Sequence, residues 1–594
     1  MSVPSPIPVD VVGTLDELLA RLRERGVERG ASIAVACAPG VGIGLEAAGS
    51  AWSLSTDDAV AAVAGLEHEL QPRWVWWGKE TAAVLVGGGL RPARCWDVAA
   101  VHRLLYGGWR DEPARVWALL NDLPTDSMPE MGQLDLLGVQ GDEGDFEAPV
   151  RPDGHLRPEW LSGAWAATGP RLARWAATAS AAAAMQQQRI AALDRHQPML
   201  ATVRSESAAE MLCVELAHDG LPIDLGRAEE IIASFVGPRA ANETEATLHR
   251  RARDEAVLQH APPGWVADLR NPAHVRSLLR GVGVDVADTR AWRLEPFRDA
   301  HPLVDALLTW RKAERIETTF GYAWLDANVG RDGRLRGGWS GSDGAAGRMT
   351  AQAGLHNMPA DLRPAVAAEP GHAFVHADLG QIEPRVLAAV SGDDALARAA
   401  DDHDMYAPVA ARLGVERPVA KVAVLAAMYG QTSGAAGQAL RGLETAYPTA
   451  MQYLRDADDA GRVGRDLRTS GGRLIRMWSL RELAERDEST DRDERAAMAA
   501  RGRFARNAVV QGAAAELFKA WAATVRARTT GLGARIVLCL HDELLVHVPV
   551  EHADDVARLV EQCLHEAAQR WAPGRRVRFV ADASVITRWS EAKP

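Results

Sequence analysis

The sequence predicts a multidomain protein in which an α/β region precedes a larger α+β region. Its 594 residues suffice for two to four domains, and 47% hydrophobic with 25% charged residues is an ordinary globular composition. Over residues 1–136, short apolar runs alternate with alanine- and leucine-rich helical patterns. A stretch rich in glycine, proline and acid at 138–158 indicates a loop or linker. The rest of the chain carries long helical patterns and a predicted β-hairpin.

The first region, residues 1–195, is expected to form one domain. The runs IAVACA (33–38) and RWVWWG (73–78) are apolar and short, as buried strands are. Residues 160–195 are rich in alanine and tryptophan and have a helical pattern. This mixture predicts an α/β fold.

The second region, residues 196–594, begins with mostly helical periodicity over 225–325. Residues 331–348 are glycine-rich and predicted to be irregular. A predicted strand, AFVHAD (373–378), precedes further helices. The segment 481–497 is highly charged and predicts a solvated helix or loop.

Composition narrows the class of protein. Five scattered cysteines form no C-x-x-C pair, which favours a reducing cytoplasm and argues against a zinc site. The first ten residues lack a basic segment followed by an apolar run, and no uncharged run is long enough for a membrane span. The net charge of −12 argues weakly against a nucleic-acid partner, because local fields decide binding. Arginine-rich stretches at 461–478 and 501–507 are either such a local field or solvated surface.

The hairpin RIVLCLHDELLVHVP (535–549) carries His541, Asp542 and Glu543 at its centre. Two adjacent carboxylates between apolar strands repel each other unless something compensates them. A divalent cation would do so, and a solvated turn is the alternative for this tripeptide alone. Asp378 ends another predicted strand, 164 residues earlier (542 − 378). Two aspartates on neighbouring strands could hold two Mg²⁺ ions for phosphoryl transfer.

The stretch RPVAKVAVLAAMYGQ (417–431) predicts a helix in which cationic, apolar and aromatic side chains recur every four residues. Two cations at a helix N-terminus suit a triphosphate, and a salt-bridged surface helix is the alternative. Lysine is scarce here, with 5 lysines among 67 basic residues. A retained lysine at Lys421 is therefore notable, since lysine can release a proton and arginine cannot.

Five stretches, in this order along the chain, resemble the motifs of family A DNA polymerases of the DNA polymerase I type over roughly residues 200–594. They are GRMTAQAGLHNMP (347–359), DLGQIE (378–383), the R-x-x-x-K-x-x-x-x-x-x-x-Y-G helix (417–430), NAVVQGAAAELFK (507–519) and HDE (541–543). The resemblance implies a right-hand fold, with a thumb at about 225–345, fingers at about 400–505 and a palm in the remainder. It places the arginine-rich stretch 461–478 near DNA.

The resemblance also implies a role for each matched residue. Asp378 and Asp542, with the backbone carbonyl of Leu379, would hold two Mg²⁺ ions, and Glu543 would support them. Lys421 would stabilise the phosphates and protonate the departing pyrophosphate. The nucleotide (dNTP) site would be formed by Arg417, Lys421, Leu425, Tyr429, Gln381, Glu383 and Tyr406. Primer–template DNA would be contacted by Arg348, Asn357, Arg503, Asn507, Gln511 and His541.

The chain departs from the family pattern at several of these positions. Leu425 stands where the family usually has an aromatic residue that stacks on the nucleotide. Pro418 opens the fingers helix and could shift Arg417, and Tyr406 stands where the family often has histidine. Leu379 and Gly380 replace the usual Tyr-Ser, which leaves a backbone carbonyl intact. We expect these changes to tune affinity and fidelity.

The first region resembles a ribonuclease H-like 3′–5′ exonuclease domain over residues 73–105. The carboxylates that such an enzyme needs are absent: the strand SIAVACAPG has no acid, Thr81 or a neighbour replaces an aspartate, and Trp165 and Gly169 replace a tyrosine and an aspartate. We expect a degenerate, non-proofreading domain. No residues remain for a 5′-nuclease domain.

The resemblance therefore implies a monomeric bacterial DNA polymerase of the cytoplasm and nucleoid, which acts in repair or replication gap filling. Two alternatives remain open. A single-subunit RNA polymerase shares the two aspartates and the Lys…Tyr-Gly helix, although Glu383 and the HDE triplet favour DNA. A catalytically silent DNA-binding protein is the other, given Leu425 and Pro418.

Overall fold

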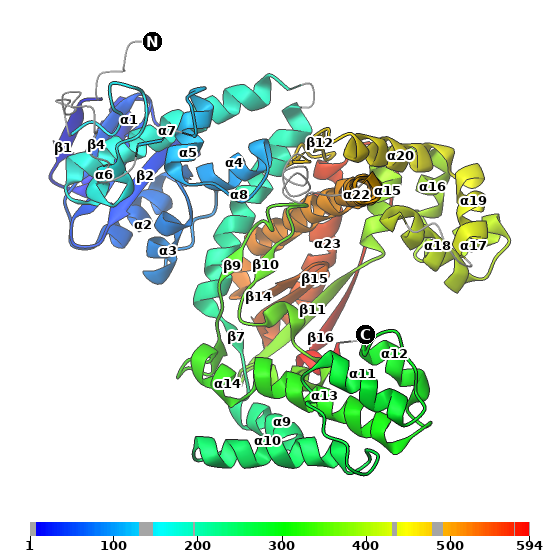
Figure 1. Cartoon of the computed structure of the whole chain (residues 1–594). Helices are drawn as coiled ribbons and strands as arrows, with labels where there is room; N and C mark the ends of the chain where they lie inside the picture. The colour runs from blue at the N-terminus through cyan, green and yellow to red at the C-terminus, as the bar shows by residue number, and fades with distance from the viewer. Residues whose placement is uncertain are drawn as a thin grey trace. The chain divides into compact units, whose positions relative to one another are not determined.

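The structure is a computed structural model that describes residues 7–126, 128–129, 147–193, 196–430, 436–477, 491–574 and 576–592. The chain divides into two compact units (Figure 1). The first unit comprises Met1–His218, Trp339–Thr350 and Val375–Val585. The second comprises Asp219–Gly338, Ala351–Phe374 and Ile586–Pro594. Most of the predicted charged segment 481–497 lies outside the described residues, and 491–497 begin a long helix.

The N-terminal part of the first unit is built on a six-stranded sheet with the order β1-β4-β3-β2-β5-β6. Strand β2 pairs antiparallel with β3 and parallel with β5, and β5 pairs parallel with β6. The strands predicted at 33–38 and 73–78 form as β2 and β5. The bounds are β1 Val9–Val12, β2 Ser32–Ala38, β3 Gly42–Ala47, β4 Ser50–Leu54, β5 Arg73–Trp76 and β6 Cys95–Asp97.

Helices cover both faces of this sheet, because every residue of β2 after Ser32 is buried. Ile33, Val35 and Cys37 belong to one hydrophobic cluster, and the alternate residues Ala34 and Ala36 belong to another. The first cluster includes α1 Leu15–Glu24, α2 Ala59–Leu70 and α3 Lys79–Gly87. The second includes α4 Val98–Tyr106, α5 Pro113–Leu120, α6 Pro158–Leu161 and α7 Gly169–Ala191. An α/β fold for the first region is confirmed.

The C-terminal part of the first unit contains a four-stranded sheet with the order β14-β15-β11-β16. Its bounds are β11 His372–Gly380, β14 Arg535–Leu540, β15 Glu543–Pro549 and β16 Val580–Ile586. The predicted hairpin is confirmed, since β14 and β15 pair antiparallel around His541 and Asp542. The predicted end of the other strand at Asp378 is wrong by two residues, because β11 continues to Gly380.

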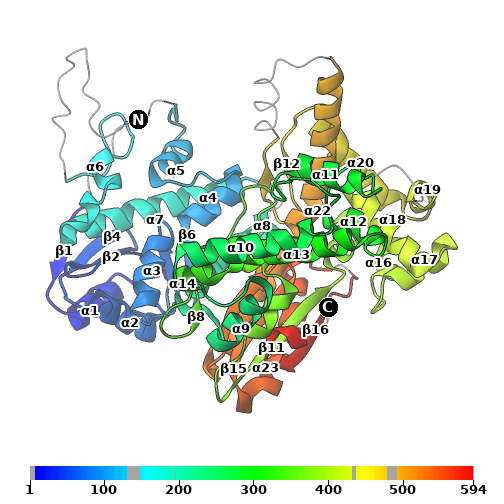
Figure 2. The same cartoon turned by 60° about the horizontal axis from the view of Figure 1, so that its bottom comes forward.

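Two helices pack together behind this sheet: α22 Asp491–Thr529 and α23 Ala553–Trp571. The buried Trp521 of α22 donates from Nε1 to the carbonyl of Val560 in α23 at 2.9 Å. Helix α20 Pro448–Arg462 also packs along α22 (Figure 2).

The remaining helices of the first unit include α15 Ile382–Ser391, α16 Asp394–Ala399, α17 Tyr406–Leu413, α18 Arg417–Tyr429 and α19 Ala436–Ala446. Buried Asp393 joins two of the helices of this group. One carboxylate oxygen caps α16 at Ala395 and Leu396, and the other accepts from the Thr449 and Ala450 amides at the start of α20, all at 3.0–3.1 Å.

The second unit is mostly helical, as predicted for 225–325. Its helices include α9 Leu225–Val236, α10 Glu243–Leu258, α11 Pro272–Gly281, α13 Pro302–Phe320 and α14 Tyr322–Asn328. A cluster of leucines and valines forms its core, with Trp310 at the edge. Trp310 Nε1 donates to Asp254 at 2.8 Å, which fixes α13 against α10.

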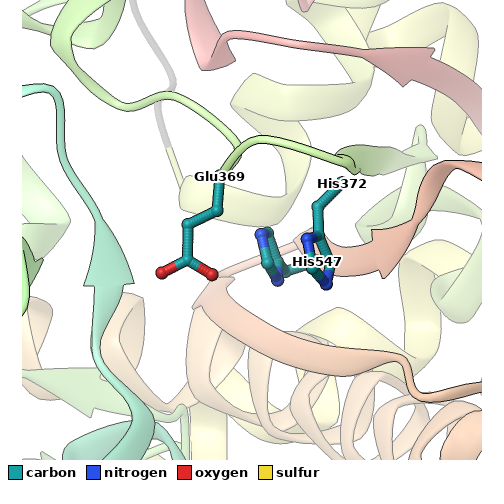
Figure 3. Close-up of side chains that lie close together, drawn as sticks. All are labelled: Glu369, His372 and His547. Carbon is teal, nitrogen blue, oxygen red and sulfur yellow. The ribbon is translucent and has the colours of Figure 1, made fainter.

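Figure 3 labels three side chains of kinds that ligate metals. Glu369 and His372 belong to the second unit, and His547 belongs to β15 of the first. Within the second unit, Glu369 accepts from Arg334 Nε and Nη2 at 3.1 and 2.6 Å. This carboxylate is already neutralised by a guanidinium, so we assign it no metal.

Helix α8 His196–Asp219 carries three buried glutamates, which we call the acidic row of α8: Glu206, Glu210 and Glu215. Each is paired with a cation inside the first unit. Lys519 Nζ lies 2.8 Å from both oxygens of Glu206, and Arg526 Nη2 lies 2.6 Å from Glu215. Arg103 of α4 pairs with Glu210. The row therefore links the N-terminal sheet region to α22.

The arginine-rich stretch 461–478 is only partly surface. Arg473 is 2% exposed and lies 2.5 Å from Glu206, so the solvated reading of this stretch is wrong for Arg473. It follows the short hairpin strand β12 Leu467–Arg468 and precedes β13 Leu474–Ile475. Arg473 helps to hold the acidic row of α8. Residue 478 lies outside the described residues.

Candidate active site

The two predicted metal-binding aspartates lie in neighbouring parts of the four-stranded sheet: Asp378 is in β11, and Asp542 is in the turn that leads into the adjacent strand β15. Asp542 occupies the turn between β14 and β15, where Leu540 pairs with Glu543. The amide of Leu379 in β11 donates to the carbonyl of Asp542 at 2.8 Å. Asp378 precedes Leu379, so this hydrogen bond brings the two aspartates together across 164 residues of sequence.

The electrostatics of the pair suit a cation. Burial raises the pKa of Asp542 to about 7, and the nearby charge of Asp378 adds to the effect. Burial and the charge of Glu543 also raise the pKa of Asp378. Among the described residues, neither aspartate has an ion pair with lysine or arginine. Paired carboxylates of this kind favour a divalent cation, which would supply the missing positive charge.

Glu543 is held differently from the two aspartates. The Nε2 atom of buried His376 lies 2.9 Å from Glu543 Oε1, and the Glu543 side chain is 13% exposed. His376 is on β11, two residues before Asp378. This contact orients Glu543 beside the two aspartates.

A cavity of about 320 Å³ opens beside Asp542 and collects most of the predicted residues. It is also lined by four residues that were not predicted to line it, Ile382, Pro384, Ala514 and Ala515. Periodicity alone gives no signal for them, because small and apolar residues on α15 and α22 also fit a core. The predicted residues that line it are Arg348, Gln381, Glu383, Tyr406, Lys421, Leu425, Tyr429, Gln511, His541 and Asp542.

Two cavity residues have left-handed backbone conformations that are unusual outside glycine. Gln381, at the start of α15, has φ +57°, and His541, in the turn, has φ +42°. The Gln381 side chain is fixed by Asp404 Oδ1, 2.9 Å from its Nε2, and by the Met405 amide, 3.0 Å from its Oε1. Such conformations concentrate at functional sites, where surrounding contacts hold them.

Helix α18 presents three of its four predicted residues to the cavity: Lys421, Leu425 and Tyr429. Their spacing of four places them along one face of the helix. The fourth, Arg417, lies outside the cavity lining and is bound in an ion pair with Asp404, 2.5 Å from Nε to Oδ2. Asp404 thus joins Arg417 to Gln381, a link that no sequence pattern predicted.

The opposite wall of the cavity contains Glu383 on α15. The hydroxyl of Tyr429 lies 3.1 Å from Glu383 Oε2, and Gln511 of α22 also hydrogen-bonds this carboxylate. Burial raises the pKa of Glu383. The three side chains form a hydrogen-bonded edge to the cavity.

The other predicted DNA contacts are not in the cavity lining. Arg503 and Asn507 lie on α22, and a Cβ added to Gly430 at the end of α18 would come within 2.9 Å of Arg503 Cγ. The Oδ1 atom of Asn507 is buried with no hydrogen-bond partner among the described residues. Asn357 belongs to the second unit, where its carbonyl accepts from Arg315 at 2.8 Å.

The N-terminal region contains a cluster of tryptophans that pack around Trp175. Trp165 stacks on Trp175 with ring centroids 6.2 Å apart, and Trp77, just after β5, is 5.1 Å from Trp175. Gly169 packs against the Ser53 side chain, 3.1 Å from an added Cβ. Strand β2 is buried and carries no acid.

Comparison with known proteins follows the same division of the chain. The model of "DNA polymerase family A" matches residues 283–591, just over half of the chain. DNA polymerase I of Chloroflexus aurantiacus is 31% identical over 322 residues, which is 49% of this chain and 33% of that protein. The thermostable DNA polymerase I of Thermus aquaticus is 29% identical over 311 residues, 46% of this chain and 35% of that protein. The aligned part of the chain spans about a third of these curated relatives.

Among solved structures, the chain resembles one described as "POL domain of Pol1 from M. smegmatis complex with DNA primer-template and dNTP". The TM-score is 0.69 at 22% identity, and the match covers 98% of this chain and all of that one. The likeness therefore includes the fold of the N-terminal region, which the family model does not reach. Among the described helices, none has the length and apolar run needed to cross a bilayer.

Proposed function

The chain belongs to DNA polymerase family A, and from that premise we propose that it is a template-directed DNA polymerase that adds dNTPs to a primer 3′ end. The observation that carries the proposal is the cavity in which Asp542, Lys421, Glu383 and Tyr429 meet. Three separate elements contribute these side chains, a hairpin turn and two helices. A surface helix or a solvated turn would not need this convergence.

Asp378, Asp542 and the carbonyl of Leu379 are proposed to hold two Mg²⁺ ions. The raised pKa values of both aspartates support this assignment, because each carboxylate is held near the other without a protein cation. When bound, the ions supply activation of the attacking 3′-oxygen and stabilisation of the leaving oxygen. Glu543, fixed by His376, keeps the turn and β11 aligned.

Lys421 is proposed to contact the triphosphate and to donate a proton to the departing pyrophosphate. It is the one lysine of the cavity lining, and an ammonium group can give up a proton where a guanidinium cannot. Arg417 is proposed to clamp the β- and γ-phosphates after exchanging Asp404 for the nucleotide. Gln381 and Tyr406 complete the nucleotide wall.

Glu383 and Tyr429 are proposed to select the sugar and to meet the templating base. Their hydrogen bond fixes the Glu383 carboxylate at the cavity edge, where a ribose 2′-hydroxyl would collide with it. Leu425 replaces the aromatic that would stack on the incoming base, so nucleotide affinity depends more on the phosphates.

Six residues are proposed to contact the primer–template. From the cavity these are Arg348, Gln511 and His541. The others are Arg503 and Asn507 on α22 and Asn357 of the second unit. Such contacts to sugar, phosphate and minor-groove edge position the duplex without reading its sequence. A polymerase that copies any template must bind the duplex independently of its sequence.

The N-terminal region, residues 1–195, is proposed to be a ribonuclease H-like domain without proofreading. Two residues support this: Trp165, matched to an exonuclease tyrosine, packs on Trp175, and Gly169, matched to an aspartate, offers no carboxylate. Residues 196–594 are proposed to form thumb, fingers and palm with the limits given above. Gap filling in DNA repair or replication is the proposed role.

Primer extension on a labelled primed template with Mg²⁺ tests the proposal. We expect extension with dNTPs, little with rNTPs, an undegraded primer when nucleotides are omitted, and no extension with EDTA. Asp542→Asn should lower the rate by at least about 10³-fold, as loss of a metal ligand does. Asp554→Asn, an exposed aspartate in the first turn of α23, is the matched control.

Each departure from that result has a meaning. A wild-type protein that binds primer–template but never extends it would favour the silent DNA-binding protein. Equal use of rNTPs would favour an RNA polymerase. Primer shortening without nucleotides would contradict the assignment of the N-terminal region.

A further inference from the structure

A second and larger cavity of about 770 Å³ lies within the first unit and shares no residue with the candidate active site. Its walls come from four parts of the fold. Arg73, Arg94 and Cys95 lie at strands β5 and β6, and the first half of α8 forms another wall. The second half of α22 and the end of α23 close it.

The cavity carries a large excess of positive charge. Five arginines and one glutamate line it: Arg73, Arg94, Arg204, Arg528, Arg570 and Glu566. Glu566 is shared by two of the arginines, with Arg528 Nη1 at 3.1 Å and Arg570 Nη2 at 3.3 Å. One carboxylate therefore faces five guanidinium groups.

The other three arginines have no carboxylate partner among the described residues. Arg73 Nη1 reaches only the Cys95 carbonyl at 3.5 Å, and Arg94 donates to the Gln71 carbonyl. The charges of Arg204 and Arg94, after burial, lower the pKa of Arg73, which shows that the three guanidinium groups are close. Like charges brought together around a cavity repel unless an anion joins them.

An indole N–H in the cavity wall also has no partner. Trp571, at the end of α23, is 7% exposed, and its Nε1 is buried without an acceptor among the described residues. Its ring is fixed edge-on against Phe579, with centroids 6.2 Å apart. A buried donor without an acceptor costs free energy, so this end of α23 is less well satisfied than the rest of the helix.

The rest of the wall is mostly apolar, with Pro198, Leu200, Pro573 and several alanines. Four uncharged polar side chains also line it: Thr202, Ser205, Thr524 and Gln569. The cavity thus pairs a cationic rim with an uncharged wall that contains one orphan donor. Its volume falls in the range of small-molecule sites, about 300–1,000 Å³.

We propose that this cavity binds a nucleoside di- or triphosphate as an effector, at a site separate from the substrate dNTP. Guanidinium groups bind phosphate oxygens in pairs, which suits the three arginines that lack carboxylates. The apolar part of the wall takes the base and sugar. Inorganic phosphate would leave that part of the wall without a contact.

Such a ligand would tie together elements that also reach the active site. Helix α22 contributes Thr524 and Arg528 to this cavity and Gln511 and Ala515 to the other. Helix α8 contributes Arg204 next to the acidic row. Ligand binding would therefore stabilise the packing of α8, α22 and α23 and raise the melting temperature.

Calorimetric titration of the full chain with ADP and ATP, without divalent cations and at two salt concentrations, tests the proposal. We expect saturable binding that weakens with salt. Arg204→Glu and, separately, Arg570→Glu should each weaken binding at least tenfold; both side chains are exposed, so the variants should fold. Arg558→Glu, an exposed arginine of α23 outside the cavity, should bind like the wild type. Circular dichroism checks the fold of each variant.

Active-site variants separate this site from the substrate site. Lys421→Ala should bind ADP as the wild type does, and adenosine should not bind. The proposal fails if no nucleotide binds saturably, or if Lys421→Ala abolishes binding and the arginine variants do not. Inorganic pyrophosphate that binds as tightly as ADP would overturn the nucleoside part.

Discussion

Leu425 lines the candidate active site at a position where the resemblance to family A polymerases predicts an aromatic residue. It lines the cavity one helical turn from both Lys421 and Tyr429, so its side chain faces the place proposed for the incoming base. An aliphatic side chain packs against a base but lacks the offset stacking of an aromatic ring. On the proposed function, nucleotide binding at this site would depend more on charge.

Leu425→Phe should therefore improve nucleotide binding. An aromatic contact is worth about 0.5–1.5 kcal/mol beyond burial, which corresponds to a KM for dNTP lowered about 2- to 10-fold. Steady-state single-nucleotide insertion measures it. Val419→Phe places the same ring on an exposed position of α18 outside the cavity and should leave KM unchanged. An unchanged KM in Leu425→Phe would mean that the base lies elsewhere.

Glu383 and Tyr429 give a second prediction at this scale. Glu383→Ala removes the carboxylate from the cavity edge, so the preference for dNTP over rNTP in kcat/KM should fall by about tenfold or more. Tyr429→Phe keeps the ring and loses only the 3.1 Å hydrogen bond, so its effect should be smaller. Glu416→Ala, exposed just before α18, is the control. If Glu383→Ala keeps the preference for dNTP over rNTP, another residue must exclude the ribose 2′-hydroxyl.

At the scale of elements, the hairpin and α18 were predictable because their sequences carry local signals. The polar triplet at 541–543 interrupts two β-rich runs, and the four-residue spacing of 417–429 matches one helix face. The Arg417–Asp404 pair was not predictable, since 13 residues and a helix boundary separate the partners. Buried Arg473 was not predictable either, because nothing in its arginine-rich neighbourhood distinguishes it from surface.

The loop before Arg348 packs closely against the hairpin that carries Arg473. Gly347 has φ +83°, and a Cβ there would come within 2.1 Å of Arg473 Nε. Gly464 has φ +71° but nothing within 4 Å of an added Cβ. The two glycines therefore share a backbone conformation and differ only in what surrounds them.

Gly347→Ala should destabilise the protein much more than Gly464→Ala. Both pay about 1–2 kcal/mol for a left-handed alanine, but Gly347→Ala also displaces Arg473 from Glu206, and a broken buried pair costs about 3–5 kcal/mol. The midpoint of urea unfolding measures both, and Gly347→Ala should also weaken primer–template binding through Arg348. Equal midpoints would show that Arg473 moves aside without cost.

At the scale of the whole molecule, the sequence predicted the two regions and the site but not how the regions are held together. Motifs at strand ends can be recognised one at a time. The acidic row of α8 and the arginine-lined cavity are assembled from segments hundreds of residues apart, and their charges look like ordinary surface in the sequence. Asp97 is another charged residue whose burial the sequence does not reveal. It is fully buried, caps α4 at Ala100 and accepts from Trp76 Nε1 at 3.0 Å.

Asp97 should give the stability of the protein a dependence on pH. Burial, with the charge of Glu210 in addition, raises its pKa from 3.8 to about 8. Between these values the folded state binds a proton that the unfolded state has released, so the free energy of unfolding falls as pH rises from about 4 to about 8. Asp97→Asn should remove this part of the slope in urea unfolding at several pH values.

Asp58→Asn, an exposed cap of α2, is the matched control and should keep the wild-type slope. A slope equal in wild type and Asp97→Asn would mean that Asp97 is ionised in the folded protein, stabilised by Arg103 and its two N–H donors.

The acidic row of α8 affects how the protein could be truncated. Glu210 is 4% exposed, and its cation, Arg103, is supplied by the region proposed to have lost its own catalysis. A shortened chain that starts at α8 would lose this guanidinium, and water would then solvate the Glu210 carboxylate. It would also expose Met199, Val203 and Met211 of α8, which are buried against the N-terminal region. A smaller version of the protein therefore needs polar replacements at these apolar positions more than it needs a new partner for Glu210.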